Sequence, residues 1–259
     1  MATIEANLSI KELELAGFAS WPAEQVIEDG SWLIRLSSKL PYKRTNSINC
    51  LSENDSDNVT ERLQKAQSVF ESVGVQPTLR TTPLTPPNLL SATSGSRWSE
   101  PFSESIVMTT RLAEDFNSDP NRAHAEFECF DHPAIEWINN YMALTMDKAK
   151  DRDTITQTLN QIEKPVQFIQ VTHNSSCIGV AVSVVQKNLV GLFGLAVAAS
   201  ARRQGLGRAL SKAALSWGKN EGASTAWLQV EADNMPARKL YESLGFVESY
   251  RYAYRSLKA

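Results

Sequence analysis

The chain has 259 residues, which allows one large domain or two small ones and is long enough to bury a sizeable core. Its composition, 42% hydrophobic and 21% charged with 12 Gly and 11 Pro, excludes a collagen-like, disordered or disulfide-scaffold protein. The formal net charge of −3 argues against a protein dominated by nucleic-acid binding.

In the first half of the chain, alternating and amphipathic patterns predict strands and two helices. The expected strands are 32–36, 44–51, 76–82 and 105–112. The expected helices are 57–73, with Gly74 as its C-cap, and 87–94, which ends at Gly95. A polar stretch from Ala113 to Arg122, with Pro120 inside it, predicts a linker.

The second half shows a longer series of strands and helices. The expected strands are 125–130, 166–172, 178–186, 189–197, 225–230 and 247–257. The expected helices are 134–146, 153–161, 205–219 and 236–243, the last two ending at Gly222 and Gly245. The sequence Asn174-Ser175-Ser176 predicts a turn between two strands.

One pattern occurs in both halves: strand, helix and glycine, strand, short helix and glycine, aromatic residue, strand. The separation is 148 residues both from Gly74 to Gly222 and from Trp98 to Phe246. We interpret this as a tandem duplication of one α+β unit, with domains 1–116 and 117–259. The alternative is a chance likeness of common α/β patterns. The first domain carries a net charge of −5 and the second +2.

The segment after the strand 189–197 predicts a phosphate site. Residues 202–208, here called the arginine–glycine loop, read Arg-Arg-Gln-Gly-Leu-Gly-Arg and open a helix. Free N–H groups at a helix start, two glycines and three arginines together favour an anion. A P-loop is not matched, because no Lys-Ser/Thr follows. A dinucleotide-binding fingerprint is not matched either, because Leu210 stands where the third glycine is needed.

The pattern Arg202-x-x-Gly205-x-Gly207 after an apolar strand resembles the acetyl-CoA motif of the GNAT superfamily of N-acetyltransferases. A second signature follows in order: Leu228-Gln229-Val230-Glu231, Asn234, Ala237, and then Leu240-Tyr241-Glu242-Ser243-Leu244-Gly245-Phe246. The resemblance covers residues 123–257. It implies an α+β fold with two tandem GNAT-like units, each a mixed, mostly antiparallel sheet flanked by helices.

The resemblance also implies roles for individual residues. Backbone groups of Leu195, Ala196 and Val197 would bind the pantetheine arm of acetyl-CoA. The pyrophosphate would be held by Arg202, Arg203, Gln204, Gly205, Leu206, Gly207 and Arg208. Asn234 would contact the cofactor near its pantetheine end, and Tyr241 would protonate the leaving thiolate.

Other roles are argued from the chemistry. An attacking amine needs a base, for which Glu231 is our choice, with Glu126 and Glu128 as alternatives. A strand N–H near Val197 is a candidate donor to the oxyanion. Two of these residues also have a purely structural interpretation. Tyr241 could be an aromatic residue of the core, and Asn234 could be only the N-cap of a helix.

The first domain differs at the matching helix start. Residues 53–58, Glu-Asn-Asp-Ser-Asp-Asn, place acids where phosphates would lie and lack a glycine pair. This resembles tandem GNAT proteins with a degenerate first domain. We hypothesise that Arg44 and Asn46 contact the acceptor. The alternative is that Arg44 pairs with a carboxylate of the protein itself and that Asn46 bonds to the backbone of a turn.

Apolar runs and cysteine spacing bear on the cellular location of the protein and on metal binding. No apolar run reaches the ~20 residues that span a bilayer, and residues 1–14 do not resemble a signal peptide. Cys50, Cys129 and Cys177 form no CxxC motif and are interpreted as buried thiols in a reducing compartment. We expect a cytoplasmic monomer or homodimer with no metal, no nucleic-acid partner and no membrane association.

The sequence therefore predicts an N-acetyltransferase that moves the acetyl group of acetyl-CoA to a primary amine of a small molecule. The amine would attack directly in a ternary complex. The alternatives are a protein or peptide N-acetyltransferase and a non-catalytic acyl-CoA-binding sensor.

Overall fold

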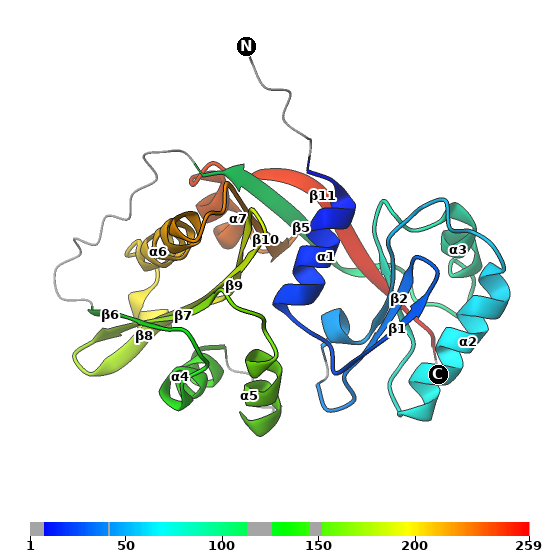
Figure 1. Cartoon of the computed structure of the whole chain (residues 1–259), viewed down its shortest axis with the longest axis horizontal. Helices are drawn as coiled ribbons and strands as arrows, with labels where there is room; N and C mark the ends of the chain where they lie inside the picture. The colour runs from blue at the N-terminus through cyan, green and yellow to red at the C-terminus, as the bar shows by residue number, and fades with distance from the viewer. Residues whose placement is uncertain (1–7, 41, 113–125, 146–151, 259) are drawn as a thin grey trace, which may run out of the picture. The chain divides into compact units, whose positions relative to one another are not determined.

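Figure 1 shows the computed structural model of the chain, which describes residues 8–40, 42–112, 126–145 and 152–258. The chain forms two compact units. The first comprises Met1–Phe18, Ala23–Glu104 and Ser249–Ala259, and the second Ala19–Pro22 and Ser105–Glu248. The predicted domain boundary between residues 116 and 117 lies outside the described residues. No helix in the described ranges is long and apolar enough to cross a bilayer.

The first unit is a sheet with helices on both faces. Its helices are α1 (Ile10–Ser20), α2 (Val59–Ser72) and α3 (Pro87–Ala92), with the short 3-10 turn η1 (Lys43–Thr45). Its strands are β1 (Gln25–Asp29), β2 (Trp32–Leu36), β3 (Ser47–Cys50), β4 (Thr78–Thr81) and β11 (Val247–Ser256). The strand order is β1-β2-β3-β4-β11, with only β3 and β4 parallel among these neighbours.

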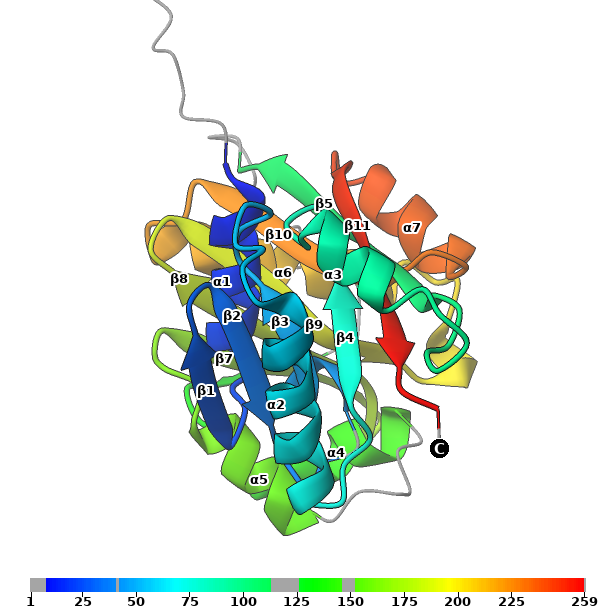
Figure 2. The same ribbon diagram turned by 90° about the vertical axis from the view of Figure 1, so that its right-hand side faces the viewer.

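The two faces of this sheet differ in chemistry. Alternate residues of β2, β3 and β4, such as Trp32, Ile48 and Leu79, pack with Leu63 and Phe70 of α2 into an apolar core. Figure 2 shows α2 and α3 lying over strands β2, β3 and β4. On the other face the strand residues are polar yet buried, and they include Arg35, Ser47, Asn49 and Arg80.

The second unit has the same layered design. Its helices are α4 (Ile135–Thr145), α5 (Arg152–Asn160), α6 (Leu206–Asn220) and α7 (Met235–Glu242), and the short 3-10 turn η2 (Ala199–Ala201) precedes α6. Its strands are β5 (Phe102–Arg111), β6 (Glu126–Phe130), β7 (Val166–His173), β8 (Ser176–Gln186), β9 (Leu189–Val197) and β10 (Thr225–Glu231). The order is β5-β10-β9-β8-β7-β6, and only β10 and β9 are parallel.

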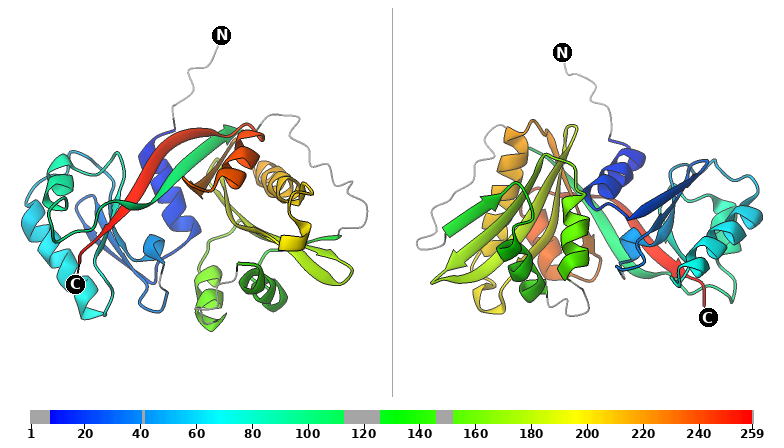
Figure 3. Two further views of the ribbon diagram at one scale, coloured as in Figure 1. Left: turned by 180° about the vertical axis from the view of Figure 1, so that it is seen from behind. Right: turned by 60° about the horizontal axis from the view of Figure 1, so that its bottom comes forward.

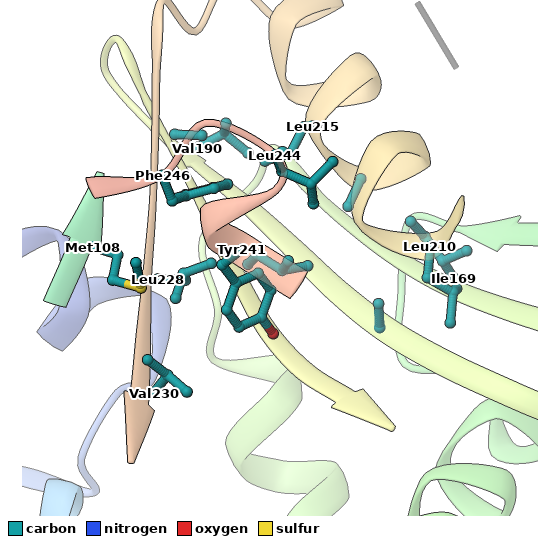
Figure 4. Packing of buried hydrophobic residues seen from close by; sticks show 14 of the residues in the cluster. Met108, Ile169, Val190, Leu210, Leu215, Leu228, Val230, Tyr241, Leu244 and Phe246 are labelled. Carbon is teal, nitrogen blue, oxygen red and sulfur yellow. The ribbon is translucent and has the colours of Figure 1, made fainter. Parts of the chain in front are cut away.

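Helices cover both faces of this second sheet. Figures 1 and 3 show α6 and α7 on one face and α4 and α5 on the other. Leu206, Leu210 and Leu215 of α6 enter a core that also holds Tyr241 of α7, and Figure 4 shows part of this core. On the opposite face, Trp137 of α4 donates from its indole nitrogen to the backbone oxygen of Ile169 at 2.8 Å.

The final strands of the two repeats are exchanged. In the order of the chain, β5 closes the first repeat and β11 closes the second. In space, β11 pairs with β4 of the first unit, while residues 105–111 of β5 pair with β10 of the second. Each unit therefore completes its sheet with the strand that the other repeat encodes, and the units are not two consecutive stretches of sequence.

The fold class and the repeated element order are confirmed. Helix α1 and strand β1 were not predicted. The α1 start has a recognisable signal, because Ser9 and Glu12 form a capping box: the Ser9 amide donates to the Glu12 carboxylate at 2.8 Å, and the Glu12 amide to the Ser9 hydroxyl at 3.2 Å.

The cysteines correct one expectation. All three are free thiols, but only Cys50 is buried, whereas Cys177 is half-buried and Cys129 is exposed. Cys129 lies on β6, the edge strand, most of whose residues face outward. The expectation of buried thiols is thus right for Cys50 alone, and burial raises the pKa of that thiol to about 12.

Candidate active site

Strands β9 and β10 separate at their C-terminal ends. They pair from their first residues to Leu192 and Leu228, and then β9 continues to Val197 and β10 to Glu231 with no further pairing between their described residues. Each strand keeps its other neighbour, β8 or β5. The edge of β9 over residues 193–197 is therefore open to an extended ligand, which could add to it like another strand.

A β-bulge in β9 explains this separation, because a bulge bends the strand that carries it. Two steps along β8, from Val180 to Val182, correspond to three along β9, from Ala196 to Phe193. Gly194 lies in the extra step with a φ of 56°. A Cβ at this position would also lie 3.0 Å from the Tyr141 ring. The glycine is needed both for its backbone conformation and for this close approach.

The arginine–glycine loop turns sharply before α6. Arg203 has a φ of 58° and Gly205, the N-cap of α6, a φ of 77°. Left-handed residues that alternate with right-handed ones turn successive N–H groups toward one side, which makes an anion-binding concavity. A positive φ at arginine costs conformational energy, so it is notable where no glycine is present.

The amides of this loop are available. Within the described part of the chain, no well-formed hydrogen bond leaves the N–H groups of residues 203–208, while the Ala209 amide already bonds to the Gly205 carbonyl oxygen. The N-terminal end of α6 adds the positive end of the helix dipole. These residues fit a phosphate or pyrophosphate group.

The three arginines have three different environments. Arg202 donates from Nε to the Val197 carbonyl oxygen at 3.1 Å, which holds the loop against the end of β9. Arg208 donates to Ser243 at the end of α7. Arg203 is exposed and makes no side-chain hydrogen bond to the described residues. Among the described residues, Arg202 uses Nε and Arg208 uses Nη1 within the protein, so Arg203 is the one of the three arginines whose whole guanidinium group is left for a ligand.

Gln204 and Asn234 have clear local roles. Gln204 donates from its side chain to the Ser200 carbonyl oxygen at 2.9 Å. Asn234 caps α7, because its side-chain oxygen accepts a hydrogen bond from the Ala237 amide at 3.2 Å. Its side-chain NH₂ group makes no hydrogen bond within the described residues. Glu231 is exposed at the end of β10.

Tyr241 lies in the core of the second unit. Its ring contacts Phe246 edge-on with 5.9 Å between centroids, and only 8% of the residue is exposed. Figure 4 shows its hydroxyl directed away from Leu244 and Phe246. That hydroxyl makes no hydrogen bond to the described residues. Burial raises the pKa of Tyr241 to about 12, so the phenol stays protonated at neutral pH.

The alternative bases form a separate polar cluster. The Gln170 side-chain nitrogen donates to Glu128 and also to Glu136, the latter at 3.2 Å. Asn140 in turn donates to the Gln170 side-chain oxygen at 3.0 Å. Glu126 is exposed on the same strand as Glu128.

The first unit lacks the features of the loop. Asp55, in the segment that matches the arginine–glycine loop, accepts hydrogen bonds of 2.7 Å from the Ser31 amide, the Ser31 hydroxyl and Arg62. The Asp55 carboxylate thus occupies the N–H and O–H donors that an external anion would need at this position. Asn46 is buried and its side chain bonds to the backbone of Ser37 and Leu40, which is the internal pairing that was the alternative to acceptor contact.

Two of the residues that shape this site were not singled out from the sequence. Gly194 could have been found, since a glycine inside an apolar strand pattern suggests a bulge. Ser243 carried no signal, because its contact with Arg208 joins two helices distant in sequence.

Comparisons with known proteins agree with this geometry. The structure resembles a GCN5-related N-acetyltransferase from Kribbella flavida with a TM-score of 0.68 and 15% sequence identity over 96% of this chain and 95% of that one. An uncharacterized N-acetyltransferase, YobR of Bacillus subtilis (strain 168), is 24% identical over 246 residues, 95% of this chain and 98% of that protein. The ribosomal protein bS18-alanine N-acetyltransferase of Escherichia coli (strain K12) is 41% identical over 90 residues, 35% of this chain and 60% of that enzyme.

The fold, the separated strands and the loop define a GNAT N-acetyltransferase with two tandem units. A family model described as "Probable histone acetyltransferase Rv0428c C-terminal" matches residues 8–255. The chain belongs to this family.

Proposed function

We propose that the chain transfers the acetyl group of acetyl-CoA to a primary amine, which attacks directly in a ternary complex. One observation carries the choice of donor: the unpaired edge of β9 ends beside a loop whose N–H groups, from residues 203–208, make no bond within the described protein. An extended amide-containing arm that ends in a pyrophosphate complements both features.

The roles of the residues follow from this arrangement. Backbone groups of Leu195, Ala196 and Val197 bind the pantetheine arm. The amides of residues 203–208 hold the pyrophosphate, and Arg203 is the guanidinium that is available to a phosphate. Asn234 reaches the pantetheine with the side-chain NH₂ that its capping role leaves over.

Tyr241 serves the leaving group as a hydrogen-bond donor. A phenol with a pKa of about 12 is a weaker acid than a free thiol, whose pKa is about 8.5, so complete proton transfer to a thiolate is uphill. Donation of a hydrogen bond as the C–S bond breaks still stabilises the developing charge. This refines the general-acid role expected from the resemblance.

Glu231 is the proposed base. It ends β10 on the side where β9 has separated, it is exposed, and it can take a proton from an ammonium directly or through water. The Glu231→Gln substitution should lower kcat at neutral pH and lessen the loss at higher pH, where the amine is already deprotonated.

Two acceptor classes are proposed. The first is a small-molecule amine. The second is the terminal or side-chain amine of a protein, which is favoured by the bS18-alanine acetyltransferase relative and by the family description, both naming protein substrates. That relative is about 150 residues long, since 90 residues are 60% of it, so it has room for one unit. Because this chain has a second unit that the relative lacks, we propose an acceptor other than the bS18 alanine.

The test is a measurement of CoA release with a thiol reagent, using purified full-length protein, acetyl-CoA and two panels of acceptors. One panel holds small primary amines and polyamines, and the other holds peptides with free N-termini, including an alanine-first peptide. Turnover on the first panel alone supports the first class, and turnover on peptides alone supports the second. Binding of acetyl-CoA by calorimetry with no turnover on either panel would instead indicate an acyl-CoA sensor.

We further propose that only the second unit binds acetyl-CoA. Asp55 fills the matching position in the first unit and would repel phosphate. A calorimetric stoichiometry of one acetyl-CoA per chain is expected, and two would contradict the proposal. We place the protein in the cytoplasm, where acetyl-CoA is available and thiols such as Cys129 stay reduced.

A further inference from the structure

Arg208, in the first turn of α6, binds the far end of another helix. Its Nη1 donates to the Ser243 backbone oxygen at 3.0 Å and to the Ser243 hydroxyl at 2.8 Å. Ser243 is the C-cap of α7, and its own hydroxyl donates to the Leu240 carbonyl oxygen at 2.6 Å. One guanidinium and one hydroxyl together satisfy carbonyl groups that end the helix.

The charge of Arg208 suits α7 rather than its own helix. A cation is unfavourable at the N-terminal end of α6, where the dipole is positive, and favourable at the C-terminal end of α7, where it is negative. The position of this arginine is therefore explained without a bound anion. Its backbone amide remains one of the free N–H groups of the loop.

A second contact joins the same two segments. Gly207 packs so closely on α7 that a Cβ there would lie 3.2 Å from a methyl group of Leu240. Two consecutive loop residues, Gly207 and Arg208, thus meet α7 at Leu240 and Ser243. Tyr241 lies between these two contact points.

We propose that Arg208 is a positioning residue, which fixes α7 to the arginine–glycine loop and so holds the Tyr241 hydroxyl in register with the bound acyl donor. The proposal rests on the proposed function, in which that hydroxyl serves the leaving thiolate. The loop that holds the pyrophosphate and the helix that carries Tyr241 become one rigid body through this contact.

The expected sensitivity follows from geometry. The helix α7 runs only from Met235 to Glu242, and the Tyr241 hydroxyl is at the end of a long side chain in its last turn. Loss of the Arg208 contact loosens that turn. A displacement of about 1 Å at a reacting group lowers the rate substantially even when binding is intact.

The test separates catalysis from binding with the Arg208→Ala variant. We expect kcat to fall by about three- to ten-fold, the size expected for loss of an exposed charge-assisted hydrogen bond. The calorimetric affinities for CoA and for dephospho-CoA should both be unchanged. The reaction is acetyl transfer to an amine on which the wild type is active or, if none is active, hydrolysis of acetyl-CoA.

A double-mutant cycle shows whether Arg208 acts through Tyr241. In a Tyr241→Phe background, Arg208→Ala should have little further effect on kcat, because the group that it positions is gone. Ser243→Ala removes the hydroxyl that accepts from Arg208 and donates to Leu240 but keeps the backbone oxygen that Arg208 also contacts, and it should give a smaller fall in the same direction. Arg208→Lys keeps the positive charge and one donor nitrogen, and should recover part of the rate. This variant also tests the proposal if Arg208→Ala does not fold.

Lys239→Ala is the matched control, since it removes an exposed positive charge from the last turn of α7 and leaves the Arg208–Ser243 contact intact. It should leave both the CoA affinity and kcat nearly unchanged. The proposal is overturned if Arg208→Ala leaves kcat unaltered, if it weakens binding of CoA or of dephospho-CoA, or if its effect multiplies with that of Tyr241→Phe. A wild type that neither binds acetyl-CoA nor releases CoA would count against the proposed function instead.

Discussion

The Nε of Arg202 donates a hydrogen bond of 3.1 Å to the carbonyl oxygen of Val197. This contact closes the turn between the end of β9 and the start of α6, so it orders the loop before any ligand arrives. A carbonyl oxygen has two lone pairs, and one of those on Val197 is thereby used. Preorganisation of this kind reduces the entropy that binding must overcome.

Substitution of Gly205 by valine should abolish acetyl-CoA binding. Gly205 has a φ of 77°, which a β-branched residue adopts only with strain, and a side chain there would crowd the free amides. Calorimetry should find no measurable heat of binding.

Gly222→Ala is the control for backbone strain alone. Gly222 follows the other end of α6 with a φ of 93°, and a Cβ there would meet nothing within 4 Å. This variant should lose some stability and bind acetyl-CoA normally. Equal binding by Gly205→Val and the wild type would remove the cofactor site from this loop.

Tyr241→Phe should lower kcat by about ten- to a hundred-fold and change the acetyl-CoA Kd little, because the lost hydrogen bond strengthens as thiolate charge develops. Steady-state rates with calorimetric Kd values give the comparison. An unchanged kcat would show that the hydroxyl has no part in the reaction.

The same variant has a signature in alkaline stability. The pKa of Tyr241 is about 12 in the folded protein and about 10 when unfolded, so between these values only the unfolded chain loses the proton. The free energy of unfolding that Tyr241 contributes is therefore complete below pH 10 and is lost as the pH rises through 12. Urea titrations should show a smaller alkaline loss for Tyr241→Phe than for the wild type.

Asp55→Asn should destabilise the protein by about 1–2 kcal/mol at pH 7, because the carboxylate accepts charge-assisted hydrogen bonds. The Arg62 guanidinium, which bonds to it, lowers the pKa of Asp55 well below its usual range. The stabilisation is present above the unfolded pKa of about 3.9 and is lost as pH falls through the folded pKa. The difference in the free energy of unfolding between Asp55→Asn and the wild type should therefore shrink in acid. Asp57→Asn, at an exposed neighbouring position, is the control and should unfold with nearly the same free energy as the wild type at pH 7.

Glu14→Gln should be among the most damaging single changes in the first unit. Glu14 and Arg80 form a buried ion pair at 2.7 Å, with side chains 1% and 3% exposed. Removal of one partner leaves a buried charge uncompensated, at a cost of about 3–5 kcal/mol. Thermal unfolding should detect it, and Glu28→Gln on an exposed strand position is the matched control. A loss below 1 kcal/mol would contradict this reading.

Local patterns were sufficient for most of the fold. Strand β9 ends at Val197, where larger apolar residues give way to the small residues Ala198, Ala199 and Ser200, and left-handed glycines follow α6 at Gly222 and α7 at Gly245. Helix α1 was harder, because its buried face carries Glu14, whose partner Arg80 lies far along the chain. A polar residue whose partner is distant looks solvent-exposed in sequence.

The site likewise has features that consecutive residues predict and features that depend on contacts between distant residues. The arginine–glycine loop was predictable because its glycines and helix start are consecutive. The use of Arg208 was not, since its acceptor Ser243 is on another helix. The separation of β9 from β10 depends on the bulge at Gly194, which is visible only as pairing between strands.

The exchanged strands predict how the chain responds to division. Fragments 1–116 and 117–259 each carry the last strand of the other unit, so each alone should expose an unfinished sheet edge and aggregate. Co-expression should restore a soluble complex, which size-exclusion chromatography would detect. Two separately soluble and folded fragments would contradict this topology.

The exchanged strands also affect the order in which the two units can fold during synthesis on the ribosome. The unit that begins first, with α1 to β4, waits for β11, which is made after all the other described strands, while the second unit already has β5 when its own strands emerge. The later unit can therefore finish folding before the earlier one, which reverses the usual N-terminal-first order. A stop codon at Tyr250, which removes most of β11, would thus leave the unit that begins first incomplete.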